Sequence, residues 1–320
     1  MNKIQTKYYN NVEDFFDDIS PWKQKISLDG YIFRGHSQEN YELIPSALRK
    51  DNLDLLWEIA NLKPVKEQEN YIHWQIMAEY SALRNFYNLA DRKGLEVPQL
   101  NKFRWSLANT PDAFINMHIE EEKQWLSPKF FEIAALAQHY GVPTRLLDWS
   151  YDIFVAMYFA FHGAFDKNGD MVIWALNKNE LRLMNTMNTQ FNIDFITPHY
   201  ASNPNLNAQK GLFTHIPSLN QSSDEIFEAL GNKINVKETD RIALDKSTLD
   251  SITSNSSDKT LLMKFIIPCS EAKKGAMILD KMGYDTAKIY PGYGGVAKQL
   301  IEQTKYFNRD KNDLFIGEAV

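Results

Sequence analysis

The sequence is nearly without cysteine, since Cys269 is the single one in 320 residues. One cysteine cannot form a disulfide within the chain, which excludes a disulfide-stapled scaffold and favours a reducing compartment. Long apolar runs are also missing: the longest, IFVAMYFAF at residues 153–161, is too short to span a bilayer. The first residues lack the apolar stretch of a signal peptide. We therefore predict a cytoplasmic protein without a membrane partner.

The chain also lacks an excess of basic residues. It has 35 Lys and Arg against 41 Asp and Glu, a net charge of −6, which argues against a dedicated nucleic-acid-binding protein. A local basic cleft remains compatible with this total, because net charge averages over the surface. The seven histidines are scattered, with no HExxH motif and no cysteine pair, so no metal site is predicted.

Aromatic residues are plentiful, with nineteen Phe, fifteen Tyr and seven Trp to fill a core. The segment GYIFRG at residues 30–35 has the composition of a short strand. Apolar residues recur at helical spacing through residues 51–126, and strands then alternate with helices. The pattern predicts one mixed α/β (α+β) unit, with residues 1–50 and 127–320 as the core and residues 51–126 as a helical insertion.

The same signals predict further elements. Helices are expected at residues 12–19, 127–140, 151–165 and 272–282, from residue 294 onward, and from the Thr110-Pro111 capping signal. Strands are expected at residues 171–176, 261–267 and 287–290. Residues 184–258 are rich in Asn, Ser and Thr, so we expect mostly surface loops there.

The first segment suited to chemistry is FRGHS at residues 33–37. Arg34 stands at the predicted end of a strand, and its rigid fork of N–H donors suits a phosphate or a carboxylate. Gly35 permits a close approach of two backbones or a positive φ. The alternative is an arginine paired with structural carboxylates at the strand end, and the segment taken alone favours that role.

The second segment is QHYGVPTRLLDWS at residues 138–150, which separates two strongly apolar stretches. Polar groups held so near a core must be hydrogen-bonded or functional. Asp148 and Ser150 are candidate caps of the following helix, and Asp152 would favour its positive end. That helix N-terminus could instead accept an anion such as a pyrophosphate.

Two alternatives stay open within this segment. Arg145 and Asp148 could form an internal ion pair and have no other role. His139 has a side chain that titrates near neutral pH, so it could serve as an acid or base, or it could hold a loop. The residues alone support a structural role and a functional role about equally.

Together the two segments resemble the FRG domain. The resemblance rests on Phe33-Arg34-Gly35, on LAQHYGVPTRLLDWS at residues 136–150 and on the apolar residues 156–160. Further similarities are AQKGLF at 208–213 and Ile289-Tyr290-Pro291, so the likeness extends over roughly residues 30–300. The FRG tripeptide is unspecific, whereas the central motif is highly specific. The family is defined by a motif and does not itself imply a reaction.

A more distant resemblance, to ADP-ribosyltransferases, suggests a reaction. In that fold an Arg-Gly pair ends the first core strand, and the Arg contacts the NAD pyrophosphate. Arg34-Gly35 is similar to this pair, and residues 146–150 and 156–160 are similar to the serine-bearing strand and the helix that follow. The third element of the fold is a Glu that holds a ribose hydroxyl. It has no clear equivalent here, and Gln209 is the closest positional candidate.

The resemblance implies an ADP-ribosyltransferase-like split-sheet core and an ADP-ribosyltransferase or NAD glycohydrolase. NAD or a related nucleotide would be its substrate, and a protein acceptor or a cognate inhibitor would be a partner. A bacterial toxin or antiviral defence effector would fit. The implied catalytic residues are Arg34, Asp148, Gln209 and His139. The implied nucleotide-binding residues are Arg34, Gly35, His36, Ser37, Tyr140, Thr144, Arg145, Trp149 and Ser150.

Two other hypotheses remain: a non-catalytic module that binds a nucleotide or a protein, and a nucleic-acid-directed effector. A catalytic site predicts that Arg34, Asp148 and Gln209 face one pocket. A binding module predicts a cleft with Arg34 but no positioned acid or acceptor. A nucleic-acid effector predicts a basic groove that extends beyond the pocket.

Overall fold

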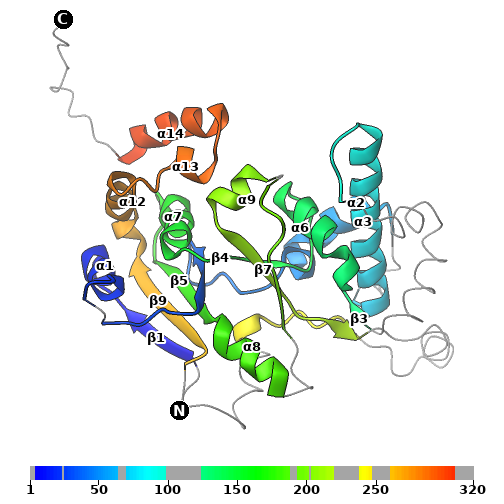
Figure 1. Cartoon of the computed structure of the whole chain (residues 1–320), viewed down its shortest axis with the longest axis horizontal. Helices are drawn as coiled ribbons and strands as arrows, with labels where there is room; N and C mark the ends of the chain where they lie inside the picture. Colours follow the sequence, from blue (N-terminus) through cyan, green and yellow to red (C-terminus); the bar gives the residue numbers. More distant parts are fainter. Residues whose placement is uncertain are drawn as a thin grey trace, which may run out of the picture.

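A computed structural model of the chain is shown in Figure 1. It describes residues 4–23, 25–63, 70–98, 124–187, 193–201, 203–219, 238–246 and 260–306. The fold is mixed α/β, as predicted from the sequence. Within the described ranges, no helix has both the length and the apolar character needed to cross a membrane.

The centre of the molecule is a seven-stranded sheet in the order β1-β9-β5-β2-β4-β7-β6. Neighbouring strands are antiparallel, except that β1 and β9 are parallel. The strands are β1 (Ile4–Tyr8), β2 (Tyr31–His36), β4 (Leu147–Ser150), β5 (Asp170–Asn177), β6 (Asp194–Ile196), β7 (Gly211–His215) and β9 (Leu262–Pro268). Two short strands, β3 (Gln124–Trp125) and β8 (Ser218–Leu219), pair separately.

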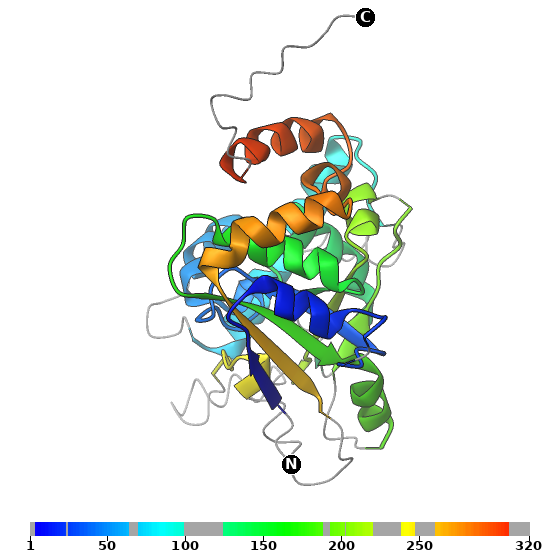
Figure 2. The ribbon, with the colours of Figure 1, turned by 90° about the vertical axis from the view of Figure 1, so that its left-hand side faces the viewer.

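Helices cover the sheet and extend it on one side. They are α1 (Val12–Ile19), α2 (Leu53–Ala60), α3 (Ile72–Arg92), α6 (Phe131–His139), α7 (Ile153–Ala164), α8 (Lys178–Met187), α9 (Pro204–Ala208), α12 (Ala272–Lys281), α13 (Thr286–Ile289) and α14 (Tyr293–Tyr306). Figure 2 shows α1, α7 and α12 stacked on one face of the sheet. Their apolar residues form a single core with Ile173 and Phe265 of the sheet.

Side-chain alternation along β5 explains the two layers. Ile173 and Ala175 face the core under α7, whereas Val172, Trp174 and Leu176 belong to a separate cluster on the opposite face. Both faces of a strand are therefore buried, which suits its nearly continuous apolar sequence. Because α7 is also apolar on most sides, it becomes the central helix of the layer.

The sheet is split between β2 and β4. These strands pair through Phe33 and Ser150 alone, whereas β2 pairs with β5 through six residue pairs and β4 pairs with β7 through four. Beyond the Phe33–Ser150 pair the two strands separate. The split determines where the functional site lies, because the side chains that follow Phe33 face the resulting fork.

Several predicted elements are confirmed. Helices occupy the ranges predicted around α1, α6, α7, α12 and α14, and strands occupy those predicted around β2, β5 and β9. Gly141, with a φ of 87°, follows the end of α6 in a conformation that favours glycine. The helix predicted from Thr110 lies outside the described residues.

Other predictions are wrong. Residues 287–290 were expected to be a strand, but α13 occupies this region and is capped by Asp285, whose Oδ1 accepts from Lys288 N at 2.8 Å. The range 184–258 was expected to be mostly loops, yet its described part holds β6, α9, β7 and β8. All five residues of β7 are buried. The strand β7 was not predicted, because it is only five residues long and is flanked by polar sequence.

Candidate functional site

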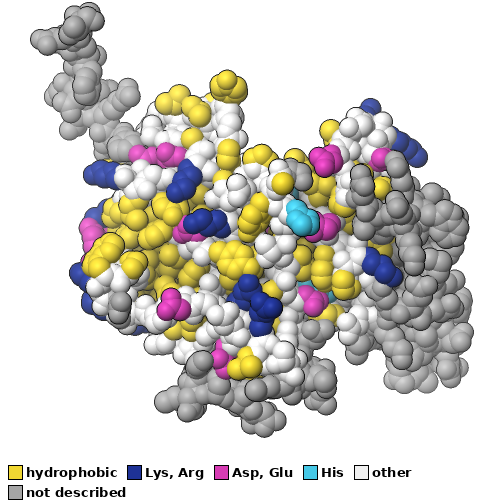
Figure 3. Space-filling view, in the orientation of Figure 1, with side chains coloured by type: hydrophobic (Ala, Val, Ile, Leu, Met, Phe, Trp, Pro, Cys, Tyr) yellow, Lys and Arg dark blue, Asp and Glu magenta, His cyan; other side chains and the backbone are white. Residues whose placement is uncertain are grey.

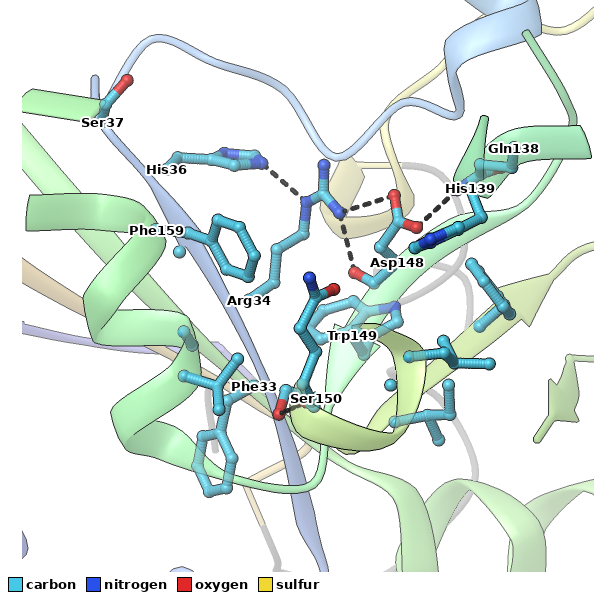
Figure 4. Close-up of a pocket in the computed structure, with 18 of the residues that line it drawn as sticks. Phe33, Arg34, His36, Ser37, Gln138, His139, Asp148, Trp149, Ser150 and Phe159 are labelled. Atoms are coloured by element: carbon cyan, nitrogen blue, oxygen red, sulfur yellow. Dashed lines mark hydrogen bonds and ion pairs between the residues drawn. The ribbon is translucent and has the colours of Figure 1, made fainter. Parts of the chain in front are cut away.

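A cavity of about 480 Å³ lies in the fork between β2 and β4 (Figure 4). Its walls come from β2, β4, β7, α6 and α7, and from the turn after α9. Polar groups gather on one side, where Arg34, His36 and Asp148 meet. Phe159 and Tyr290 contribute aromatic surface. A concave site with a few convergent polar groups is the usual form of a small-molecule site.

Arg34 bridges the split in the sheet. Its Nη1 donates to the main-chain oxygen of Asp148 at 2.7 Å and approaches Asp148 Oδ2 at 3.4 Å, and its Nε donates to His36 Nε2 at 2.8 Å. Its Nη2 makes no hydrogen bond with any residue that the structure describes. Nη2 is therefore the donor that Arg34 keeps available for a ligand.

Gly35 lets α7 approach β2 closely. A Cβ atom at this position would lie 1.9 Å from the main-chain oxygen of Ala156. Gly35 is not among the glycines with positive φ, so close approach is the alternative that the structure supports. Because Gly35 has no side chain, α7 packs directly against β2. Ala156 and Phe159 of α7 therefore become part of the cavity wall.

His36 holds Arg34 in place. Its Nδ1 lies 3.1 Å from the main-chain oxygen of Tyr41, and its Nε2 accepts from Arg34 Nε. These contacts require the neutral ring with hydrogen on Nδ1. Burial lowers the pKa of His36, and the positive charge of Arg34 lowers it further, to about 3. His36 therefore orients Arg34 and does not exchange protons near neutral pH.

This arrangement predicts that His36 makes the fold sensitive to acid. Between about pH 6.5 and 3, an unfolded histidine binds a proton that the folded His36 excludes, so stability falls as the pH falls through this range. In His36→Gln, Oε1 can still accept from Arg34 but does not titrate. Between pH 7 and pH 5 the variant should lose about 1–2 kcal/mol less than the wild type in urea unfolding. Equal losses in the two proteins would show that His36 does not resist protonation.

Asp148 is held between two donors at the cavity. Its Oδ1 accepts from Gln138 Nε2 at 2.6 Å, and its Oδ2 faces Arg34. Gln138 is itself oriented, because its Oε1 accepts from the hydroxyl of Thr144. The Asp148 side chain remains 56% exposed. It is therefore a positioned carboxylate that a ligand can reach.

His139 lies in the same wall as Asp148. Burial lowers the pKa of His139, while the negative charge of Asp148 acts in the opposite direction. The ring is thus more readily neutral than a free histidine, which suits an acceptor of protons better than a donor.

Nine of the predicted site residues line the cavity, and three do not. Those that line it are Arg34, Gly35, His36, Ser37, His139, Asp148, Trp149, Ser150 and Gln209. Tyr140 is largely exposed beside the cavity wall, and Thr144 is buried behind Gln138. Arg145 lies elsewhere, in a buried pair with Glu79. The structure thus places these three predicted residues outside the cavity lining.

The structure corrects two expectations about Asp148 and its neighbours. The ion pair between Arg145 and Asp148, which the sequence left open as an alternative, does not form, because Arg145 binds Glu79 and Asp148 faces Arg34. The predicted capping of α7 by Asp148 or Ser150 is also wrong, because Asp152 is the N-cap and accepts from Phe154 N at 3.0 Å.

The N-terminus of α7 is already occupied by a carboxylate. Asp152 also accepts from Lys210 Nζ and from the Tyr284 hydroxyl, each at 2.8 Å. The sequence left open an external anion, such as a pyrophosphate, at this helix N-terminus. The structure instead places the carboxylate of Asp152 there. Among the residues that line the cavity, Arg34 is the arginine that faces a ligand.

Gln209 lines the cavity, but its amide is engaged elsewhere. Its Nε2 donates to the main-chain oxygen of Ile289 at 3.3 Å, which ties the turn after α9 to α13. The hydroxyl of Ser150 donates to the main-chain oxygen of Gln209 at 2.7 Å. Gln209 therefore joins the cavity wall to the C-terminal helices.

Some lining residues were missed in the sequence. Phe159 follows Val155 and Ala156 at helical spacing along α7 and lines the cavity with them. The same apolar spacing is typical of a buried helix face, so it did not identify Phe159 as a site residue. Tyr41 lies in irregular chain after β2, where no pattern identifies it. Only in the folded chain does Tyr41 lie next to His36 at the end of β2.

Two further observations concern metal binding and the nucleic-acid hypothesis. Among the residues that the structure describes, no three His, Cys, Asp or Glu side chains are grouped so that they could hold a metal ion. On the face shown in Figure 3, Lys and Arg side chains lie in separate patches with Asp and Glu nearby. They do not form a continuous basic groove through that face, as the nucleic-acid hypothesis predicts.

Comparison with known families identifies part of this arrangement. Residues 29–169 match the FRG domain family, whereas no curated protein and no solved structure gives a significant match. The matched range contains β2, α6, β4 and α7, and it ends before residues 208–213 and 289–291. The chain is therefore an FRG domain-containing protein, and its FRG domain supplies Arg34, His36 and Asp148 to the cavity.

Proposed function

We propose that the cavity binds NAD or a related nucleotide and that the protein is an ADP-ribosyltransferase-like enzyme, acting as a transferase or as a glycohydrolase. One observation carries the proposal. Arg34 at the end of β2 meets Asp148 of β4 across the fork of a split sheet, although the two residues are 114 positions apart in the chain. This pairing joins a cation suited to phosphate with a carboxylate suited to ribose.

Arg34 would bind the pyrophosphate. Burial and the charge of Arg49 lower the pKa of Arg34, while Asp148 opposes them, so the guanidinium lies where water stabilises its charge poorly. An arginine nevertheless keeps its charge at neutral pH. A phosphoryl anion at Nη2 would supply the missing counter-charge, while His36 and Asp148 hold the other two nitrogens.

Asp148 would act at the ribose. Cleavage breaks the bond between C1′ and the nicotinamide nitrogen, and the bonding pair leaves with nicotinamide, which loses its positive charge. A water or acceptor oxygen then forms the new bond to C1′, and its proton passes to Asp148 or to solvent. The carboxylate also stabilises the oxocarbenium-like state between these events.

Aromatic side chains support a nucleotide ligand. Phe159 and Tyr290 line the cavity with ring centroids 6.5 Å apart and nearly perpendicular planes. Such surfaces pack well against a nicotinamide or adenine ring. The cavity thus offers the three environments that a dinucleotide requires: a cation, a carboxylate and an apolar wall.

Arg34→Ala and Asp148→Asn should affect different steps. We expect Arg34→Ala to weaken NAD binding at least tenfold, because it removes a charge-assisted contact of about 1.5–3 kcal/mol. Asp148→Asn keeps the shape of the side chain, so it should bind NAD but lose nicotinamide release. Calorimetric titration measures the binding, and nicotinamide release measures the turnover. Arg182→Ala, an exposed arginine on α8, is the matched control and should resemble the wild type.

The outcomes distinguish the competing functions. NAD binding that depends on Arg34 without any turnover would favour a non-catalytic nucleotide-binding module. The engagement of Gln209 with Ile289, at the position nearest to the missing glutamate, is the observation in favour of that second candidate. Absence of both binding and turnover would overturn the use of NAD and leave the FRG assignment unchanged.

A further inference from the structure

We propose that the cavity contains a second anion subsite, formed by Ser37, Tyr41 and Lys167, which recognises an additional terminal phosphoryl group on the nucleotide. This inference rests on the proposed nucleotide function. It concerns the end of the cavity beyond His36, where Figure 4 places Ser37 on the far side of that ring from Arg34.

Three side chains from two distant parts of the sequence meet at this end. Lys167 follows α7, and its Nζ donates to Ser37 Oγ at 2.8 Å and approaches the Tyr41 hydroxyl at 3.4 Å. These partners are 130 and 126 positions away in the chain. Ser37 and Tyr41 both line the cavity. The ammonium therefore contacts two side chains of the cavity lining, while Lys167 itself lines a neighbouring hollow with Asp166 and Lys273.

Lys167 has no ion-pair partner within the described part of the chain, although its Nζ makes a cation–π contact 5.3 Å from the centre of the Tyr41 ring. Its side chain is half-buried, and none of the described carboxylates comes within 4.0 Å of its Nζ. Lys273 provides the contrast, because its Nζ lies 3.1 Å from Asp166 on the same side of the molecule. A phosphoryl anion beside this ammonium would add a charge-assisted contact.

The two hydroxyls complete the subsite. An ammonium has only donors, so Ser37 Oγ and the Tyr41 hydroxyl must accept from Lys167. Their own hydrogens are then directed elsewhere, and neither finds an acceptor among the described residues. Two O–H donors next to a cation are well suited to the oxygens of a phosphoryl group.

The subsite is separate from the anion position at Arg34. Arg34 and Ser37 are three residues apart at the end of β2, which corresponds to about 10 Å along an extended chain. The neutral ring of His36 stands between them (Figure 4). The ligand would therefore carry anionic groups at two places. The second is either a phosphate ester on a ribose or the end of a polyphosphate chain.

Two ligand pairs test the inference with the full-length chain. NADP exceeds NAD by a ribose phosphate, and ATP exceeds ADP by a terminal phosphate. In calorimetric titrations we expect the wild type to bind the more phosphorylated member about tenfold more tightly in one of the pairs. Lys167→Met should remove this preference and leave the affinity for the other member within about twofold. These factors correspond to the loss of one charge-assisted contact.

Matched variants separate the subsite from general effects. Lys273→Met makes the same change of charge on the same side of the molecule without touching either hydroxyl, so it should keep the preference. Tyr41→Phe removes one donor and should reduce the preference several-fold. This variant also provides a test if Lys167→Met fails to fold, which circular dichroism would show.

Each outcome decides the question. A Lys167-dependent preference in the NADP pair identifies a ribose phosphate, and one in the ATP pair identifies a polyphosphate end. Equal affinities within both pairs, or a preference that survives Lys167→Met, would overturn the subsite, while Arg34-dependent NAD binding would keep the proposed function. If none of the four nucleotides binds, the proposed function fails and the subsite fails with it.

Discussion

Replacing Glu79 with alanine is expected to lower the free energy of unfolding by about 3–5 kcal/mol, because it leaves Arg145 as an unpaired buried charge. Arg145 Nε and Nη2 donate to the two carboxylate oxygens of Glu79, each at 2.9 Å. The two side chains are only 4% and 3% exposed. Neither water nor salt can compensate for the lost partner at such a site.

The surroundings of Glu79 explain why its charge is kept. Burial alone would raise the pKa of Glu79, but the charge of Arg145 and hydrogen bonds from Arg145, Gln75 and Trp125 together lower it. Gln75 Nε2 donates at 2.8 Å, and Trp125 Nε1 donates at 2.7 Å. With every oxygen satisfied, the ionised pair joins α3, the chain before α6 and the chain before β4. The alanine variant disrupts all of these contacts.

Two controls test this explanation in urea unfolding. Glu13→Ala breaks an exposed pair with Lys274 and should leave the urea midpoint nearly unchanged, because exposed ion pairs contribute little to stability. A double variant with methionine at both Glu79 and Arg145 should recover much of the loss, because it removes both buried charges. A loss below about 1 kcal/mol for Glu79→Ala would show that the pair contributes little to stability.

Gly35→Ala is expected to destabilise the protein by about 3 kcal/mol or more, or to prevent folding. The added methyl would lie 1.9 Å from the main-chain oxygen of Ala156 and 2.9 Å from the main-chain nitrogen of Ala160. Backbone atoms of a packed helix cannot move aside as a flexible side chain can, so α7 would have to shift off β2. Overpacking of a core typically costs about 1–3 kcal/mol and occasionally more, even where side chains and backbone shift to relieve it.

Gly294→Ala is the matched control for this substitution. Gly294 lies in α14, and nothing stands within 4 Å of the position that its Cβ would occupy. Alanine there should be neutral or should add up to about 1 kcal/mol, because it favours the helix over the unfolded chain. Thermal and urea unfolding of both variants provide the comparison. Similar behaviour of the two would show that the approach of α7 to β2 is not restrictive.

The FRG tripeptide therefore has three distinct roles. Phe33 packs in the core beneath α7 and forms the last pair of β2 with β4. Arg34 faces the fork and bridges to Asp148. Gly35 admits the helix that completes the cavity wall. Arg34 presents its guanidinium to the cavity, and the other two residues determine the geometry in which it does so.

The sequence by itself determined the mixed α/β character, most of the long helices and the two segments that form the site. These features follow from local patterns, because apolar spacing, capping residues and the specific central motif are read within short stretches of chain. Short or polar elements such as β7 and α13 gave no comparable signal, and their structure depends on the neighbours that bury them.

Only the tertiary structure decided which charges pair. Arg145 pairs with Glu79 across 66 positions rather than with the nearby Asp148, and Arg34 reaches Asp148 across 114 positions. The split between β2 and β4 and the meeting of Lys167 with Ser37 likewise appear only in the folded chain. A charged side chain that folding takes out of water is stabilised by whatever donor or acceptor lies within a few ångströms, and its position in the sequence does not decide which one that is.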